Sequence, residues 1–284
     1  MTKYNDIFKQ VTDQIVANLE HADNWRKPWG NIATGDAPHN AVTGHIYTGF
    51  NWLLLSTSEY ASPQWLTYKQ AKAKGGNVRK GERGTQITYF KMMRKEDKQG
   101  NESVFPMLKV YTVFNIEQTK NVTGIKEPVI PTVPEGGANA IADALGVDLQ
   151  YGGDRACFIP QYDIVKMPVA ESFKDRANHD ATLLHELTHW TGHKSRLDRL
   201  KALSKGDTGY AFEELIAELG SAMLGSILGL PYDGLQHDSY IASWLKVLKS
   251  DPKHIYTASK HAKKAVEYII EHALEQGVDI AEVA

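Results

Sequence analysis

The chain has 284 residues, of which 42% are hydrophobic and 23% charged, a composition ordinary for a globular protein with one large or two medium domains. No apolar run approaches the roughly 20 residues of a membrane span and the N-terminus lacks a secretory pattern, so we expect no membrane partner. The single cysteine, Cys157, excludes an intrachain disulfide and a thiolate zinc site, and the expected location is the cytoplasm.

Charge is distributed unevenly along the chain. Residues 1–125 hold 16 Lys and Arg against 11 Asp and Glu, whereas residues 126–284 hold 16 against 23. The basic excess concentrates between Trp65 and Lys95, where Glu82 is the single acid. This asymmetry predicts that the first half binds a polyanion and the second half does not.

Aromatic and basic residues interleave in the first half. The segment from Trp25 to Gly30 places two tryptophans beside two cations in a loop that contains proline and glycine. Such rings can stack on unpaired bases while the cations neutralise phosphates, although a pair of buried core tryptophans would give the same pattern. The residues that we predict to bind single-stranded DNA are Trp25, Arg26, Lys27, Trp29, Lys69, Arg79, Lys80 and Arg83.

One of these cations, Lys69, lies in a helix that we predict over Ser62–Gly76 with Thr67 as its N-cap, and Arg79, Lys80 and Arg83 follow this helix. A charge run is usually a solvated face. Here several aromatic residues accompany the cations and favour a nucleic-acid surface: Trp65, Tyr68, Tyr89 and Phe90.

Two strand-like segments follow, TQITYFKMM and VFPMLKVYTVFNI, and they predict a long hairpin. The stretch Gln118–Gly137 then carries three prolines and ends in two glycines, which is linker composition. We therefore expect a first domain at 1–125, a linker at 126–137 and a second domain at 138–284. A small sheet is expected between Val147 and Met167, where an edge strand can pair with an extended peptide.

The run HELTHWTGH, from His185 to His193, contains the most informative motif. On a helix, His185 and His189 project from one face and can hold one divalent metal. Glu186 then lies beside the metal and can take a proton from a bound water. The alternative is an accidental pattern with solvated histidines, and a further ligand candidate downstream argues against it.

That candidate lies in a second predicted helix, Tyr210–Met223. Glu214 and Glu218 are one turn apart, so one can bind the metal while the other holds a histidine in orientation. Apolar neighbours predict that this helix is buried, and buried carboxylates need a metal or a cation. Two histidines and one glutamate with an open position suit zinc first and manganese as an alternative.

Three polar residues are candidate donors to an oxyanion: Tyr210, His237 and Tyr240. The third histidine of a metzincin would come two residues after His193. We therefore interpret His193 as part of the helix end.

Long co-linear segments of the chain resemble ArdC-type antirestriction proteins, a plasmid-borne family. The resemblance rests on WRKPW, the run from Thr43 to Leu55, VRKGE, HELTHWTGH, EELIAE and YIASWLKVLK. It implies an α+β protein with an N-terminal mixed α/β single-stranded-DNA-binding domain and a C-terminal, mostly helical, zincin-like metallopeptidase domain with a small sheet. It also implies protection of incoming plasmid DNA from host restriction.

By analogy with gluzincins, the resemblance assigns His185, His189 and Glu214 as metal ligands, Glu186 as the catalytic base and Glu218 as the group that holds a histidine. The gluzincin pattern has aspartate where this chain has Glu218, one methylene longer.

Three functions stay open. The first is an antirestriction protein that binds single-stranded DNA and carries a peptidase-like site with an unknown protein or peptide substrate. The second is a DNA-associated metalloprotease that cleaves a restriction subunit or a DNA-bound protein. The third is a pure DNA-binding protector with a structural metal, and Glu186 argues against it, because binding a metal does not require that residue.

Overall fold

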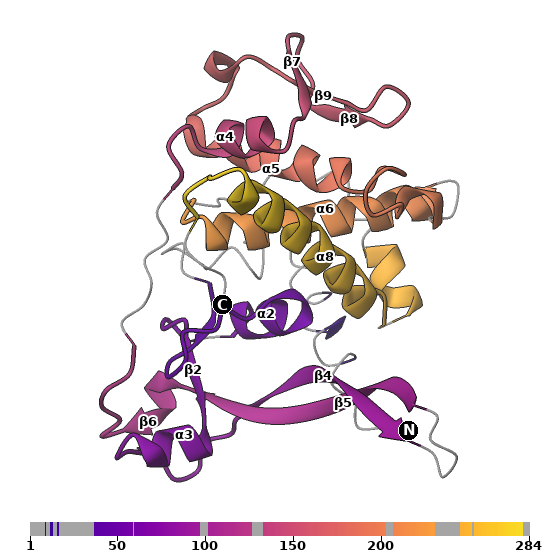
Figure 1. Cartoon of the computed structure of the whole chain (residues 1–284). Helices are drawn as coiled ribbons and strands as arrows, with labels where there is room; N and C mark the ends of the chain where they lie inside the picture. The colour runs from indigo at the N-terminus through magenta and orange to yellow at the C-terminus, as the bar shows by residue number, and fades with distance from the viewer. Residues whose placement is uncertain are drawn as a thin grey trace. The chain divides into compact units, whose positions relative to one another are not determined.

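The computed structural model of the chain divides by its contacts into two compact units (Figure 1). The helical unit comprises Met1–Ala37, Thr48–Thr57 and Val129–Ala284, and the sheet unit comprises Pro38–Tyr47 and Ser58–Pro128. The residues that the structure describes are Lys9, Thr12, Asp13, Val16 and 37–58, 60–96, 102–126, 133–202, 207–230, 245–251 and 253–280.

The sheet unit is built on a four-stranded sheet with the order β1-β2-β5-β4. Its strands are β1 (His39–Asn40), β2 (Gln64–Thr67), β4 (Thr85–Glu96) and β5 (Glu102–Asn115). β1 is parallel to β2, and the other pairs are antiparallel. A second small sheet pairs β3 (Asn77–Val78) with β6 (Thr119–Lys120), after the 3-10 turn η2 (Ile116–Gln118).

The β4–β5 ribbon confirms the predicted hairpin and is longer than the other strands (Figure 1). Both strands extend beyond the two predicted segments into the polar residues between them, and pairing ends with Glu96 opposite Glu102. The reason is that the backbone ladder pairs N–H and C=O groups whatever the polarity of the side chains.

The helix predicted over Ser62–Gly76 is shorter in the structure, because its first residues pair with β5 as strand β2. Helix α3 spans Tyr68–Ala73. Its predicted N-cap is confirmed: the Thr67 hydroxyl accepts from the Gln70 N–H at 3.2 Å, and the Gln70 side chain accepts from the Thr67 N–H at 2.8 Å. Ala71 of this helix packs with Ala41 and Leu66 in the core of the sheet unit.

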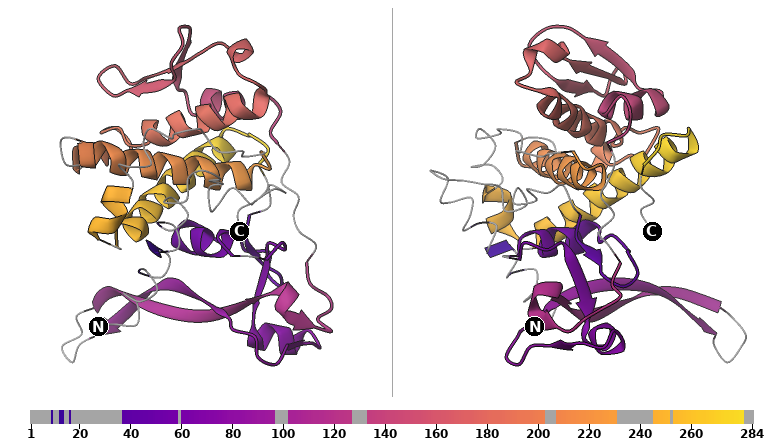
Figure 2. Two further views of the ribbon diagram at one scale, coloured as in Figure 1. Left: turned by 180° about the vertical axis from the view of Figure 1, so that it is seen from behind. Right: turned by 90° about the vertical axis from the view of Figure 1, so that its left-hand side faces the viewer.

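The α-helices of the helical unit with described bounds are α2 (Gly49–Ser56), α4 (Ala138–Ala144), α5 (Arg176–Trp190), α6 (Asp207–Ile227) and α8 (Lys253–Glu275). Helix α6 packs against both α5 and α8. The predicted small sheet has the order β7-β9-β8 and lies beside α4 and α5 (Figure 2). Its strands are β7 (Asp148–Tyr151), β8 (Cys157–Ile159) and β9 (Ile164–Met167). Of the helices that the structure describes, none is both long and apolar enough to cross a bilayer.

Helix α2 belongs to the helical unit although it lies within the first 125 residues. The indole N–H of Trp52 donates to Ser226 Oγ at 2.9 Å, and the rings of Phe50 and Tyr256 meet edge to face at 5.5 Å. Segments of the helical unit and of the sheet unit therefore alternate along the chain. The expected domains, 1–125 and 138–284, do not coincide with these units, and their independent folding stays a prediction.

Candidate metal centre

Helix α5 carries two of the candidate ligands and begins at a capped turn. The carboxylate of Asp175 accepts from the Asn178 N–H at 2.8 Å. Leu184 and Leu187 of this helix are fully buried. Because His185 and His189 are one turn apart, their imidazoles project from the same side of α5.

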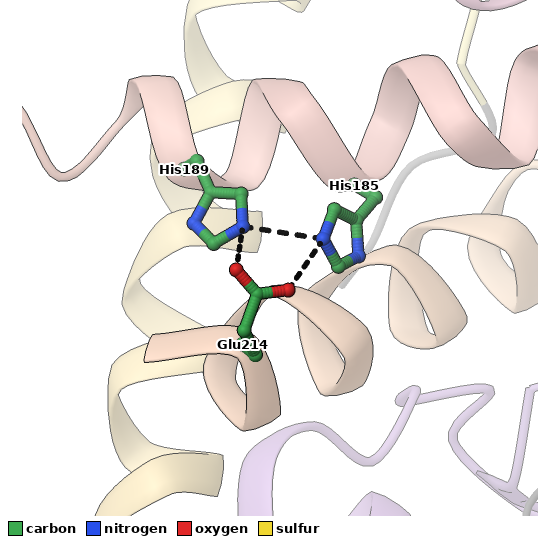
Figure 3. A group of neighbouring side chains, drawn as sticks. All are labelled: His185, His189 and Glu214. Atoms are coloured by element: carbon green, nitrogen blue, oxygen red, sulfur yellow. Dashed lines mark hydrogen bonds and ion pairs between the residues drawn. The ribbon is translucent and has the colours of Figure 1, made fainter. Parts of the chain in front are cut away.

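The two imidazoles converge on the carboxylate of Glu214 from α6 (Figure 3). The two Nε2 atoms are 3.2 Å apart, and the Glu214 oxygens lie 3.5 Å from His185 Nε2 and 3.4 Å from His189 Nε2. A tetrahedral ion with ligand bonds of about 2.0–2.1 Å requires ligand atoms roughly 3.3 Å apart. The two nitrogens meet this spacing, and with one oxygen of Glu214 the three ligand atoms lie within 4.8 Å of one another, close enough for the three side chains to hold a single divalent ion.

The outer nitrogen of each histidine faces a further carboxylate of α6. His189 Nδ1 is 3.1 Å from Glu213 Oε1, and His185 Nδ1 is 3.7 Å from Glu218 Oε2. The first distance is that of a hydrogen bond and the second that of a looser ion pair. Such contacts orient an imidazole and determine which nitrogen faces the metal.

Arg199 binds Glu213 in the protein interior. Its Nε and Nη2 donate to the Glu213 carboxylate at 2.7–3.1 Å, Nη1 donates to Thr191 Oγ1 at 2.9 Å and Nη2 to the Thr188 carbonyl at 2.6 Å. Arg199 and Glu213 are each 5% exposed. This buried pair connects the end of α5 to α6 next to the candidate ligands.

Sequence patterns predicted that Glu218 holds a histidine, and they predicted no role for Glu213 or Arg199. The adjacent glutamates Glu213 and Glu214 were the available signal for the first. No local signal marks Arg199, because its approach to α6 depends on the path of the chain after α5.

Glu186 is 7% exposed, and its Oε2 accepts the Phe158 N–H of edge strand β8 at 2.8 Å. Burial raises the pKa of Glu186. The charge of His189 and the hydrogen bond from the Phe158 N–H lower this pKa, and the charge of Glu214 adds to the rise. A carboxylate with a raised pKa is a stronger proton acceptor than an ordinary glutamate.

The metal-free cluster holds a proton between its histidines and carboxylates. Burial opposes the imidazolium form, but hydrogen bonds to Glu213 and Glu214 outweigh burial and raise the pKa of His189 to about 10. Burial likewise opposes the carboxylate of Glu214, and hydrogen bonds to His185 and His189 outweigh it and lower the pKa of Glu214. The site is therefore preorganised for a positive charge.

Comparison with known proteins identifies the family. Residues 136–261 match the model of a zincin-like metallopeptidase, and residues 5–114 match the N-terminal domain of anti-restriction factor ArdC. The metal-free crystal structure of antirestriction protein ArdC from plasmid R388 is 39% identical, covers 95% of this chain and 98% of that chain, and has a TM-score of 0.78. The chain belongs to the ArdC antirestriction family. The two expected modules and the α+β fold class are confirmed.

Relatives of this ArdC-family chain differ in length. The Sinorhizobium fredii protein y4eC is 35% identical over 98% of this chain and 95% of its own length. Two Escherichia coli DNA primases TraC are 38% and 37% identical, but the chain spans only 27% and 20% of their length. ArdC from R388 also has a Mn(II)-bound structure, with a TM-score of 0.77 and 38% identity, covering 94% of this chain and 97% of that one. The zincin-like module and this neighbour support a divalent metal, and both zinc and manganese accept this ligand set.

The candidate oxyanion donors remain predictions. Tyr210 lies on α6 with 55% of its surface exposed. His237 and Tyr240 lie outside the described residues.

The predicted DNA-binding residues of the described sheet unit lie on its surface. Lys69 is on α3, and Arg79, Lys80 and Arg83 lie in the segment between β3 and β4. Of these cations, Arg79 forms an ion pair with Glu82 at 2.7 Å. The remaining predicted DNA-binding residues lie outside the described part of the chain: Trp25, Arg26, Lys27 and Trp29.

Among the aromatics that favoured a nucleic-acid surface, Trp65 is 1% exposed and is a core residue. Tyr68 and Tyr89 are 50% and 56% exposed. Tyr68 lies next to Lys69, and Lys72 Nζ is 5.9 Å from the centre of the Tyr68 ring. The α3 surface therefore combines an exposed ring with cations, as base stacking and phosphate contacts require.

Proposed function

We propose that this antirestriction protein binds single-stranded DNA through the sheet unit and hydrolyses a peptide bond at the metal centre of the helical unit. The observation that supports the peptidase activity is the convergence of His185, His189 and Glu214 within 4.8 Å, with Glu186 next in sequence on the same helix. Structural metal sites normally use four protein ligands, whereas three ligands leave a position for water and substrate. Zinc is the metal that we propose first, with manganese as the alternative.

The protein side chains divide the catalytic work. A divalent metal bound by His185, His189 and Glu214 would polarise the substrate carbonyl and acidify a water. Glu186 takes the proton of that water and passes it to the departing amine. Phe158 holds one oxygen of Glu186 through its backbone N–H, which fixes the carboxylate and leaves the other oxygen for the proton.

Binding of DNA rests on the exposed cations and rings of the sheet unit. We propose that Lys69, Lys80 and Arg83 contact phosphates and that Tyr68 adds to the predicted stacking by Trp25 and Trp29. Arg79 contributes less, because Glu82 already binds its guanidinium at 2.7 Å. Contacts of this kind give little sequence preference and strong salt dependence.

Protection of DNA and peptidase chemistry are separable in this proposal, because none of the proposed DNA-binding residues belongs to the metal centre. The test is transfer of unmodified DNA into a restricting host that expresses each variant at equal level. We expect Glu186→Ala to keep protection, whereas the combined Lys69→Ala, Lys80→Ala and Arg83→Ala variant loses it. The matched control replaces two exposed lysines of the helical unit, Lys260→Ala and Lys264→Ala, and keeps protection.

A different outcome would change the mechanism. If Glu186→Ala binds DNA normally and fails to protect, protection depends on proteolysis of a restriction subunit or another DNA-bound protein. If metal removal abolishes protection while Glu186→Ala does not, the metal acts as a structural element of a pure DNA-binding protector.

A further inference from the structure

A second polar cluster of the helical unit opens onto a cavity of about 470 Å³ near the start of α5. None of the three candidate metal ligands lines this cavity. The residues that line it are Gly136, Asn139, Tyr151, Val169, Ala170, Glu171, Arg176 and His179. The volume is within the range of cavities that bind small molecules.

Hydrogen bonds connect the cavity surface to two buried residues. Asn139 Nδ2 donates to Tyr151 Oη at 2.5 Å, Tyr151 Oη is 3.3 Å from His179 Nε2, and His179 Nδ1 is 3.0 Å from Asp180 Oδ1. His179 and Asp180 are each 1% exposed. An ionised Asp180 accepts only, so His179 Nδ1 carries the proton and Nε2 accepts from the Tyr151 hydroxyl. At 3.3 Å this last bond is long, and a ligand carboxylate is a stronger acceptor for the Tyr151 hydroxyl than the neutral imidazole nitrogen.

The guanidinium of Arg176 is held at the same cavity. Its Nε donates to Asp180 Oδ1 at 2.7 Å, and its Nη2 donates to the Gly136 carbonyl. A Cβ atom at Gly137 would lie 2.4 Å from Asp180 Oδ2 and 2.7 Å from Arg176 Nη2, so only glycine lets the backbone pass against this pair. These two contacts use the Nε–Nη2 edge of the guanidinium, and 56% of the Arg176 side chain stays exposed.

The donors and the walls of the cavity indicate the class of ligand. The Arg176 guanidinium, the Asn139 amide and the Tyr151 hydroxyl all donate, and a carboxylate is an acceptor that takes several such bonds. The Tyr151 ring, Val169 and Ala170 add apolar surface beside them. Glu171 is the one acid of the lining; it is exposed, and water screens its charge.

We propose that this cavity binds a carboxylate carried on a small apolar group, as found at the C-terminus of a peptide or in a free carboxylic acid. Buried Asp180 orients the Arg176 fork, and the ligand carboxylate accepts from Arg176, Asn139 and Tyr151. The site is independent of the proposed peptidase chemistry, because it shares no side chain with the metal centre.

Calorimetric titration of the full-length, metal-free protein tests the proposal, after metal and chelator are removed by dialysis. The probes are N-acetyl-leucine and its neutral analogue N-acetyl-leucinamide. We expect the carboxylate to bind at least about tenfold tighter than the amide, because bonds to a charged group are the stronger ones. Equal binding of the two probes, or saturable binding of neither, would overturn the proposal.

Substitutions of the lining residues test whether the carboxylate binds in this cavity. Arg176→Gln is expected to lower the affinity for N-acetyl-leucine by about 10- to 100-fold. Tyr151→Phe, which keeps the ring, should lower it by about tenfold, and both variants should change the affinity for N-acetyl-leucinamide little. The matched control is Tyr162→Phe at a tyrosine that is 76% exposed, and it leaves both affinities unchanged. An unchanged acid-to-amide ratio in folded Tyr151→Phe contradicts the assignment. His185→Ala should keep carboxylate binding, and its loss there would place the ligand in the metal centre instead.

Discussion

The metal centre and the cationic surface of the sheet unit both depend on charged side chains, yet the protein treats these charges differently. At the metal centre the carboxylates of Glu213, Glu214 and Glu218 are nearly inaccessible to water, and each faces a histidine. On the sheet unit the side chains of Lys69, Lys80 and Arg83 are exposed. Buried charges require defined partners, whereas exposed charges are stable in water without them.

This difference teaches where a single substitution has a large effect. Each residue of the metal centre is held in one geometry by its neighbours, so a single substitution there changes metal binding or catalysis strongly. A surface cation acts through summed electrostatics, and its neighbours compensate for its loss.

Glu186→Gln gives the largest expected effect. It should lower any peptidase activity by a factor of about 10²–10⁴ while metal stoichiometry and fold are kept, because the amide cannot accept the proton. Hydrolysis of a fluorogenic peptide library, together with metal analysis of the same sample, measures this. Loss of metal from the variant would show that Glu186 is a ligand.

Removal of a metal ligand should weaken metal binding more than removal of the carboxylate that contacts a ligating histidine. Glu214→Ala is expected to abolish stoichiometric metal binding, whereas Glu218→Ala lowers metal affinity by about 10- to 100-fold. Competition with a chromophoric chelator ranks the two variants. Equal retention of metal in both would point to Glu213 as the third ligand.

Arg199→Met tests how much a buried ion pair stabilises the protein compared with an exposed one. It leaves the Glu213 carboxylate buried without its cation, which costs about 3–5 kcal/mol of stability, and it disturbs the orientation of His189. Chemical denaturation and chelator competition measure the two effects. The control Arg79→Met removes an exposed arginine from the Glu82 pair and should leave stability within about 1 kcal/mol. Similar destabilisation by both variants would contradict the distinction between buried and exposed pairs.

The pH dependence of metal binding follows from the raised pKa of His189. In the metal-free protein the stability gained from the protonated imidazole is present below the ordinary value of 6.5 and is lost as the pH rises through about 10. A metal must displace this proton, so apparent affinity should rise about tenfold per pH unit between roughly pH 7 and pH 9. Calorimetry in buffers of different ionisation enthalpy counts the released protons. No release at pH 8 would rule out a protonated His189.

The smallest expected effects are on the exposed surface. Single changes Lys80→Ala or Arg83→Ala should weaken binding of single-stranded oligonucleotide a few-fold, and each should reduce the salt slope by about 0.7. Arg79→Ala serves as the matched control with a smaller change, because its charge is already paired with Glu82. Fluorescence anisotropy of the full chain over a salt series measures both quantities. Salt-independent binding would remove phosphate contacts from the mechanism.

The sequence by itself determined the local features. The spacing of His185 and His189 predicted that both project from one face of a helix, and Thr67 was predicted as the N-cap that begins α3. Two strand-like segments in succession predicted the β4–β5 hairpin. Each of these depends on interactions between residues a few positions apart, and hairpin pairing extends them through one short connection.

Only the tertiary structure decided which distant groups meet. Helix α2 lies within the first 125 residues and yet packs with Ser226 and Tyr256, because its apolar side chains are buried in the helical unit. Arg199 reaches Glu213, and the backbone of Phe158 reaches Glu186, across separations that no periodicity encodes. Burial makes these contacts obligatory, since a charged or polar group removed from water must find a partner, and the path of the whole chain determines which partner is within reach.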